Sequence, residues 1–171
     1  DSSYKLVQHL KETSGTTTSD STSNSNNGTK LSATEPNPVI SGQIEGAQDL
    51  DGTDDYIGVA ANSSLSVGTS MTISVWFNRQ TTTLSQTLAA TNKYYAAGYN
   101  GNWLFRVTSG SALAFASYNG QANEEWKEFS FTITNDVWNY AVISINGTTA
   151  TMYLNGVPSA SGTLSHTKSL L

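Results

Sequence analysis

The chain contains no cysteine, little charge and no long apolar run, and each absence removes a class of protein. Without cysteine, the 171 residues hold no disulfide bond and no thiolate metal site. Charged residues make up only 12% of the sequence, and its eight lysines and arginines form no basic stripe. Nucleic acid is therefore not an expected partner. No apolar stretch approaches the ~20 residues of a membrane span, so none is expected.

Small polar residues take the place of charge, and this composition is typical of a secreted all-β protein. Hydrophobic residues amount to 37% and aromatic residues to 10% of the chain, which is enough to form a core. The residues that favour long helices are sparse. The length suits one domain covering residues 1–171.

Short stretches in which apolar and polar side chains alternate predict antiparallel strands at close spacing. In SMTISVWFN, for example, Thr72, Ser74 and Trp76 occupy the register opposite to the apolar side chains. Asn-Gly pairs at Asn146-Gly147 and Asn155-Gly156 predict hairpin turns. Further strands are predicted in DDYIGVA, NWLFRV, ALAFASY, KEFSFTI, WNYAVISI and TATMYLNG.

The first 38 residues are more polar and predict less regular structure. Tyr4 and Leu6 alternate with polar neighbours, which predicts a strand around residues 4–10. Residues 11–38 read as a long structured loop with one short strand near Lys30. The two prolines of EPNPV bar a central strand at the end of this loop.

Four stretches of the chain, taken in order, are informative together. They are YKLVQHLKETSGTTTSDSTSNSNNGT, SGQIEGAQDLDGTDDYIGV, SMTISVWFN and NDVWNYAVISINGTTATMYLNGVP. In this order they resemble the LamG-like jelly-roll family of the concanavalin A-like lectin/glucanase superfamily. The resemblance spans residues 4–165 and implies an all-β, antiparallel two-sheet jelly-roll sandwich. Such domains occur in bacterial and archaeal surface or secreted proteins, so an extracellular or cell-surface location is expected. Trp76 and Trp138 resemble core positions of the family.

The end of the chain departs from the family pattern. Such domains usually continue after LSH through further strands, whereas this sequence ends in TKSLL. We therefore expect the closing strand to be missing or supplied from outside. Because an unpaired edge accepts an added strand, other domains of the same protein or a neighbouring subunit are expected partners.

The loop DSTSNSNNG, residues 20–28, places oxygen-bearing side chains at alternate positions. Ca²⁺ is held by about six to eight oxygens from carboxylates, amides and carbonyls. We predict a Ca²⁺ site with Asp20, Asn24 and Asn26 as ligands, and the resemblance adds that LamG-like domains often carry structural Ca²⁺. A second carboxylate could come from Glu12 or residues 51–55. The alternative is a loop of Asx turns, in which these side chains bond their own backbone.

Catalysis is not expected from the residues present. The stretch NEEWKEF places Glu124 and Glu128 on one strand face, but Trp126 occupies the position between them where glucanases carry an acid. Four residues of strand span about 13 Å. Glycosidases separate their carboxyls by only about 5–9.5 Å. No nucleophile elbow is present, and His9 and His166 lie at opposite ends of the chain.

Binding of a glycan or polysaccharide needs only aromatic rings and hydrogen-bonding side chains. Trp103 alternates with Phe105 and Val107, so it is either a ligand-binding residue or a core residue. We therefore predict a non-catalytic carbohydrate-binding module of a secreted or cell-surface multidomain protein. The alternative is a structural or adhesive domain, a spacer or fibre subunit without a small-molecule ligand. The predicted ligand-binding residues are Trp103, Tyr118, Trp126, Tyr95, Tyr99 and Asn102.

Overall fold

The computed structural model divides the chain into two compact units, unit 1 (Asp1–Leu65) and unit 2 (Ser66–Leu171). Each is described by itself, and a single domain over residues 1–171 stays a prediction. The structure describes residues 2–31, 36–80, 83–91, 100–119, 124–159 and 161–164. Within these ranges, the side chains at positions 40, 100–102, 118, 119 and 124–126 are not described.

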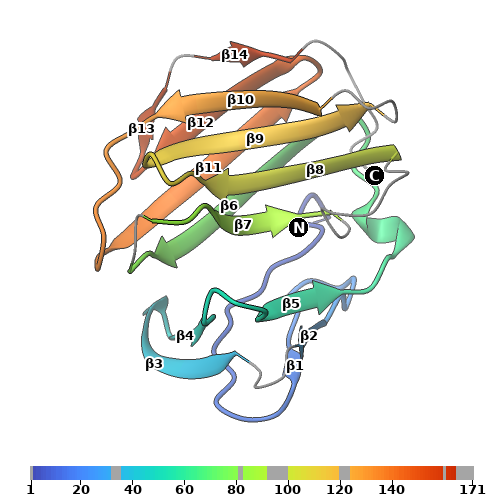
Figure 1. The fold of residues 1–171 in the computed structure, drawn as a ribbon. Helices are drawn as coiled ribbons and strands as arrows, with labels where there is room; N and C mark the ends of the chain where they lie inside the picture. The colour runs from blue at the N-terminus through green and yellow to red at the C-terminus, as the bar shows by residue number, and fades with distance from the viewer. Residues whose placement is uncertain are drawn as a thin grey trace. The chain divides into compact units, whose positions relative to one another are not determined.

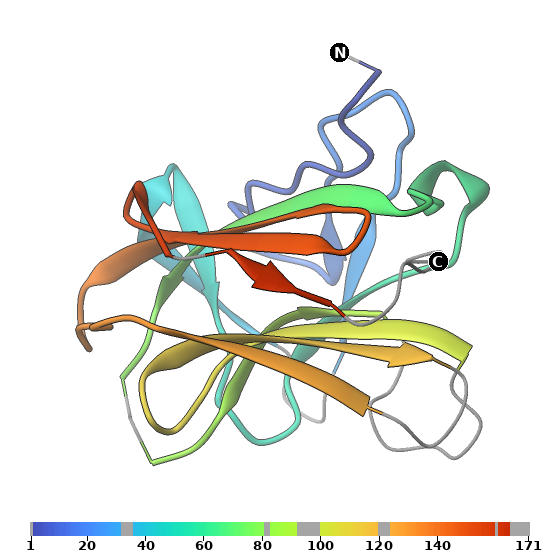
Figure 2. The same cartoon turned by 90° about the horizontal axis from the view of Figure 1, so that it is seen from above.

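Unit 2 consists of two antiparallel sheets that lie face to face (Figures 1 and 2). The first sheet has the order β10-β9-β8-β7, and the second has the order β13-β12-β11-β6 with β14 also paired to β12. This arrangement confirms the predicted all-β antiparallel sandwich. The strands of the first sheet are β7 Gln86–Ala90, β8 Asn100–Val107, β9 Ala112–Asn119 and β10 Glu124–Ser130. Those of the second are β6 Ser70–Asn78, β11 Trp138–Asn146, β12 Thr149–Leu154, β13 Val157–Pro158 and β14 Gly162–Thr163.

The two-residue period of the strands decides which side chains fill the core of unit 2. On β11, Ala141, Ile143 and Ile145 point inward and are almost fully buried, while the residues between them are half-buried. Phe105 and Phe115 meet them from the other sheet and are fully buried. The same cluster includes Phe77, Val107, Leu113, Phe129, Met152 and Leu154.

Two hairpin turns of the second sheet have the backbone geometry that their residues favour. Leu154 pairs with Val157, and Asn155 and Gly156 between them have φ of 51° and 81°. Positive φ at both central positions is the type I′ pattern. In the β11–β12 turn Asn146 is already paired, and Gly147 with φ of 59° is the first central residue. This second turn therefore lies one residue later than the Asn146-Gly147 pair predicted.

Unit 1 contains two small sheets among its described residues. One has the order β1-β2-β5, with β1 Thr17–Thr18, β2 Gly28–Leu31 and β5 Tyr56–Val59. β2 confirms the short strand predicted near Lys30. The other pairs β3 (Asn37–Ile44) with β4 (Gly46–Asp49), and a short 3₁₀ turn, η1, covers Ser63–Leu65. Pro38 lies within β3, which is compatible with its missing N–H because β3 pairs with one strand only.

The strand predicted around residues 4–10 is wrong. The segment makes only an isolated bridge between Gln8 and Asp20. Its main chain is bonded mainly to side chains of the following loop: Asn24 and Asn26 donate to the carbonyl of Lys5, and Val7 N–H donates to Asp20. Because these side chains satisfy the backbone, the segment has no need of a continuous strand partner.

Arg79, directly after β6, ties three segments of unit 2 together from a buried position. Its side chain is only 2% exposed. Nε donates to Asn135 Oδ1 at 3.1 Å, Nη1 to the Thr108 carbonyl at 3.1 Å and Nη2 to Ser111 Oγ at 2.8 Å. These acceptors are uncharged, and burial lowers the pKa of the guanidinium. The buried charge therefore fixes the β8–β9 turn through directional hydrogen bonds.

Among the residues described, no helix is both long and apolar enough to pass through a bilayer.

The alternation on β11 predicts unequal effects of shortening two adjacent side chains. Ile143→Ala removes a fully buried group and should lower the free energy of unfolding by about 2–5 kcal/mol. Val142→Ala shortens a half-buried group on the opposite face and should cost about 1 kcal/mol or less. Urea unfolding measures both, and equal losses would contradict the assigned faces.

Candidate binding surfaces

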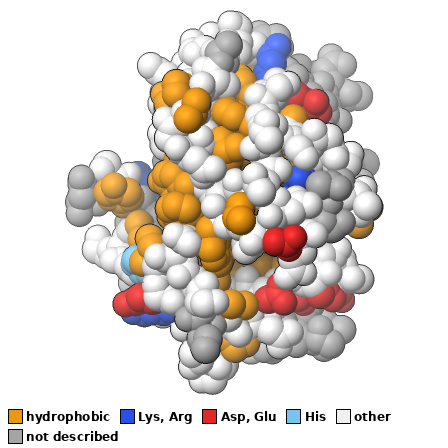
Figure 3. Space-filling model, turned by 90° about the vertical axis from the view of Figure 1, so that its left-hand side faces the viewer, with side chains coloured by type: hydrophobic (Ala, Val, Ile, Leu, Met, Phe, Trp, Pro, Cys, Tyr) orange, Lys and Arg blue, Asp and Glu red, His pale blue; other side chains and the backbone are white. Residues whose placement is uncertain are grey.

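The surface of the molecule has few charges, which limits the chemistry of any ligand. On the face shown in Figure 3, hydrophobic side chains are exposed among uncharged groups, and charged side chains are few. Polar uncharged and aromatic groups are therefore the main candidates for contact. Four surface features could contact a ligand: the Asp20 loop, the acidic turn that follows β4, a pocket in unit 1 and the outer face of the β11 sheet.

Asp20 accepts four hydrogen bonds and is the centre of its loop. Oδ1 accepts from Val7 N at 2.9 Å and from Thr22 N at 3.0 Å. Oδ2 accepts from Thr22 Oγ1 at 2.7 Å and from Asn26 N at 2.9 Å. Burial alone would raise the pKa of Asp20, but these hydrogen bonds lower the pKa to about 2. The carboxylate is thus held ionised by backbone and hydroxyl donors.

The two asparagines predicted as metal ligands lie in the same loop and bind the preceding segment. Asn24 Nδ2 donates to the carbonyls of Tyr4 and Lys5, both at 3.2 Å. Asn26 is buried, and its Nδ2 donates to the Lys5 carbonyl at 2.8 Å and to Ser64 Oγ at 2.9 Å. Asp20 could ligate an ion only by exchanging some of its hydrogen bonds for it. Ligation of Ca²⁺ by Asp20, Asn24 and Asn26 stays a prediction.

The turn between β4 and β5 brings three carboxylates together. Asp51, Asp54 and Asp55 can each place an oxygen within 4.8 Å of the others. Asp51 Oδ1 accepts from Thr53 N at 2.7 Å, which lowers the pKa of Asp51. Asp55 Oδ2 accepts from Asp51 N, whereas Asp55 Oδ1 is a buried atom without a hydrogen-bond partner. In charge and oxygen type, these residues fit a hard cation better than the Asp20 loop does.

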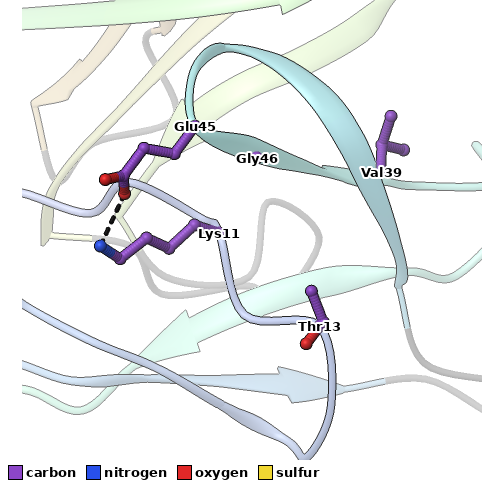
Figure 4. A pocket seen from close by; sticks show the side chains of 5 residues that line it. All are labelled: Lys11, Thr13, Val39, Glu45 and Gly46. Atoms are coloured by element: carbon purple, nitrogen blue, oxygen red, sulfur yellow. Dashed lines mark ion pairs between the residues drawn. The ribbon is translucent and has the colours of Figure 1, made fainter.

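Unit 1 also has an open pocket of about 390 Å³ on the β3–β4 hairpin (Figure 4). Lys11 and Glu45 lie on its wall and form an ion pair of 2.6 Å. The pairing raises the pKa of Lys11 and lowers the pKa of Glu45. Both side chains are more than half exposed, so the pair adds little stability. With its charges neutralised by each other, the pocket presents no pronounced charge to a ligand.

Of the six predicted ligand residues, the structure describes the side chain of Trp103 alone. Its ring stacks on Phe115 with centroids 6.3 Å apart and packs against the core of unit 2. Trp103 therefore lies on the inner face with Phe105, as the alternative interpretation had it. Its role in ligand binding stays a prediction. Tyr95 and Tyr99 lie outside the described residues, as do the side chains of Asn102, Tyr118 and Trp126.

The strand that carries the two candidate catalytic glutamates is described by its backbone register. On β10, Glu124 pairs with Tyr118, Trp126 with Ala116 and Glu128 with Ala114. Glu128 is exposed, and the side chain of Glu124 lies outside the described part. The register keeps a tryptophan between the two glutamates.

The outer face of β6, β11 and β12 carries four aromatic residues, which we call the aromatic face: Trp76, Trp138, Tyr140 and Tyr153. Trp76 on β6 is directly opposite Tyr140 on β11, and their ring centroids are 4.9 Å apart at an angle of 33°. Trp138 and Tyr140 are two residues apart on β11. Val142 follows Tyr140 in the outer register of β11, and it is paired with Tyr153 on the neighbouring strand β12. The four residues thus lie on three neighbouring strands.

The expectation that Trp76 is a core residue is wrong. Trp76 is 39% exposed, and Trp138 is half-buried on the same outer face. The signal was present in the sequence, because Trp76 shares its register with Thr72 and Ser74. A tryptophan in the polar register of a strand indicates either a packed outer layer or a contact surface.

The hydrogen bonds to Asp20 predict a pH-dependent loss of stability in Asp20→Asn. An amide turns an NH₂ group toward donors, so the variant should unfold about 1–2 kcal/mol more easily at pH 7 after allowance for solvent screening. Because the folded pKa is about 2 against 3.8 for the free group, the difference should shrink as pH falls through this window. Denaturant unfolding from pH 7 to pH 2 measures it. Asp49→Asn, which removes an exposed carboxylate of the same unit, is the control.

A solved protein structure has a fold similar to that of this chain. Comparison with curated proteins finds no match. A solved structure of an S-layer domain-containing protein from Clostridium thermocellum is similar over 93% of this chain and 72% of that chain. The identity is 20% and the TM-score is 0.57, which shows a shared fold.

The family comparison covers most of the chain. Residues 51–170 match the Laminin_G_3 family model, described as the concanavalin A-like lectin/glucanases superfamily. The match includes all strands of unit 2 and β5 of unit 1. The predicted LamG-like resemblance is confirmed, and the chain belongs to the concanavalin A-like lectin/glucanase superfamily.

Proposed function

We propose that this chain is a non-catalytic carbohydrate-binding domain of a secreted or cell-surface protein. The observation that carries the proposal is membership of a lectin/glucanase superfamily without the glucanase arrangement of acids. On β10 the position between Glu124 and Glu128 is Trp126. The two glutamates are about 13 Å apart along an extended strand, whereas glycosidase carboxyls are about 5–9.5 Å apart.

A structural role in a surface layer is the second candidate. It is favoured by the similarity to the S-layer domain-containing protein, which covers nearly the whole chain. A domain of this kind would act as a spacer or fibre subunit and need no small-molecule ligand. The same similarity supports a location at the cell surface.

A glycan array tests the main proposal. The protein is applied once in millimolar Ca²⁺ and once in EDTA. Binding to a defined set of glycans is the expected result, because the chain combines exposed aromatic rings with a surface rich in hydroxyl and amide groups. Absence of binding in both conditions contradicts carbohydrate binding and favours the structural role.

We also propose Ca²⁺ as a stabilising ion of unit 1. A folded state that binds the ion is stabilised by mass action, so thermal unfolding should shift upward with Ca²⁺ and return with EDTA. Loss of the shift in Asp20→Asn supports the predicted loop site, and loss in Asp54→Asn supports the acidic turn. Differential scanning calorimetry measures the shift, and an unchanged wild-type midpoint contradicts the proposal.

A further inference from the structure

Trp76 and Tyr140 form an aromatic surface that the core of unit 2 does not use. The core is filled by the inward registers of the same strands, among them Phe77, Ala141 and Ile143. Trp76 keeps 39% of its surface exposed, although the centroid of the Tyr140 ring lies only 4.9 Å from its own. Exposed aromatic area of this kind is apolar, yet the other outer positions of β6 carry serine, threonine and asparagine.

Hydroxyl and amide groups flank Trp76 along β6. On β6 the outer register continues from Trp76 to Ser74 and Thr72 in one direction and to Asn78 in the other, all of them exposed. Thr72 Oγ1 and Ser144 Oγ lie 3.4 Å apart across β6 and β11. Groups that both donate and accept hydrogen bonds suit sugar hydroxyls, which do the same.

Charge is missing from the whole face. The strands β6, β11 and β12 contain no aspartate, glutamate, lysine, arginine or histidine. An anionic polysaccharide or a nucleic acid would find no cation on them. A neutral sugar needs none, because its aliphatic ring face packs on aromatic rings and its hydroxyls bond to neutral polar groups.

We infer that the aromatic face binds neutral glycans, with Trp76 and Tyr140 as the platform for a sugar ring. The inference rests on the proposed function and deepens it, because it names the surface and the charge class of the ligand. Neighbouring strands lie about 4.8 Å apart, so three strands offer a platform about 10 Å wide. The site is on the sheet opposite to the one that carries Trp103, Tyr118 and Trp126.

The test compares variants of the full chain on neutral and anionic polysaccharides. Affinity electrophoresis uses cellulose derivatives, chitin fragments and yeast β-glucan as neutral probes, with alginate and heparin as anionic probes. Wild type should bind a neutral probe and neither anionic probe. Trp76→Ala should weaken that binding about tenfold or more, whereas Trp76→Phe keeps a ring and most of the affinity. Leu84→Ala, which shortens an exposed apolar residue of unit 2 outside the aromatic face, should bind as wild type.

A second measurement does not depend on the stability of a variant. The chain has four tryptophans, and each gives one indole N–H signal in a proton–nitrogen correlation spectrum. The single variants Trp76→Phe, Trp103→Phe and Trp126→Phe assign the three corresponding signals. The neutral probe that binds should shift this signal more than the Trp103 and Trp126 signals, and a larger shift at Trp103 or Trp126 overturns the inference.

The outcomes separate the inference from the proposed function. Binding to neutral probes that Trp76→Ala leaves intact overturns the inference while carbohydrate binding stands. Binding to alginate or heparin alone overturns the assignment to neutral sugars. Failure to bind any probe or arrayed glycan overturns both. A dimer that Trp76→Ala converts to a monomer in light scattering, with glycan binding unchanged, assigns the face to a second copy and overturns the inference.

Discussion

The strict two-residue alternation of β11 between β6 and β12 is the constraint on which unit 2 depends. Ala141, Ile143 and Ile145 fill the core, so the intervening positions must face outward. The register then places Tyr140 directly opposite Trp76. A slip of one residue would bury these rings and expose the isoleucines. Core packing and the exposure of the aromatic face are therefore two results of one register.

Unit 1 depends on hydrogen bonds between side chains and the main chain. Its N-terminal segment lacks a continuous strand partner and is held by side chains that bond to the main chain, with Asp20, Asn24, Asn26 and Gln48 as the main contributors. Hydrogen bonds to a charged acceptor are stronger than neutral ones. The low pKa of Asp20 reports this arrangement. A loop rich in serine and asparagine can thus be ordered without an apolar core.

The lack of charged residues on β6, β11 and β12 matters both for the solubility of the sheet and for the proposed function. Sheets with few charged side chains would be prone to association if their outer faces were aliphatic. Here serine, threonine and asparagine occupy most outer positions of β6. Aromatic residues interrupt them at one end of the face. The same composition that keeps the sheet compatible with water also supplies the hydrogen-bonding groups that a neutral sugar would need.

The amino-acid sequence by itself determined the all-β class, the alternating strands and their hairpins, because a period of two and Asn-Gly pairs act locally. β7 was not predicted, because QTLAA has no clear alternation. The strand predicted around Val7 was wrong, because the main chain there is bonded to side chains of the following loop. Only the tertiary structure decided which aromatic side chains a second sheet covers. It moved Trp103 toward the core and Trp76 to the surface, since burial depends on the sheet that packs opposite and not on the residue type.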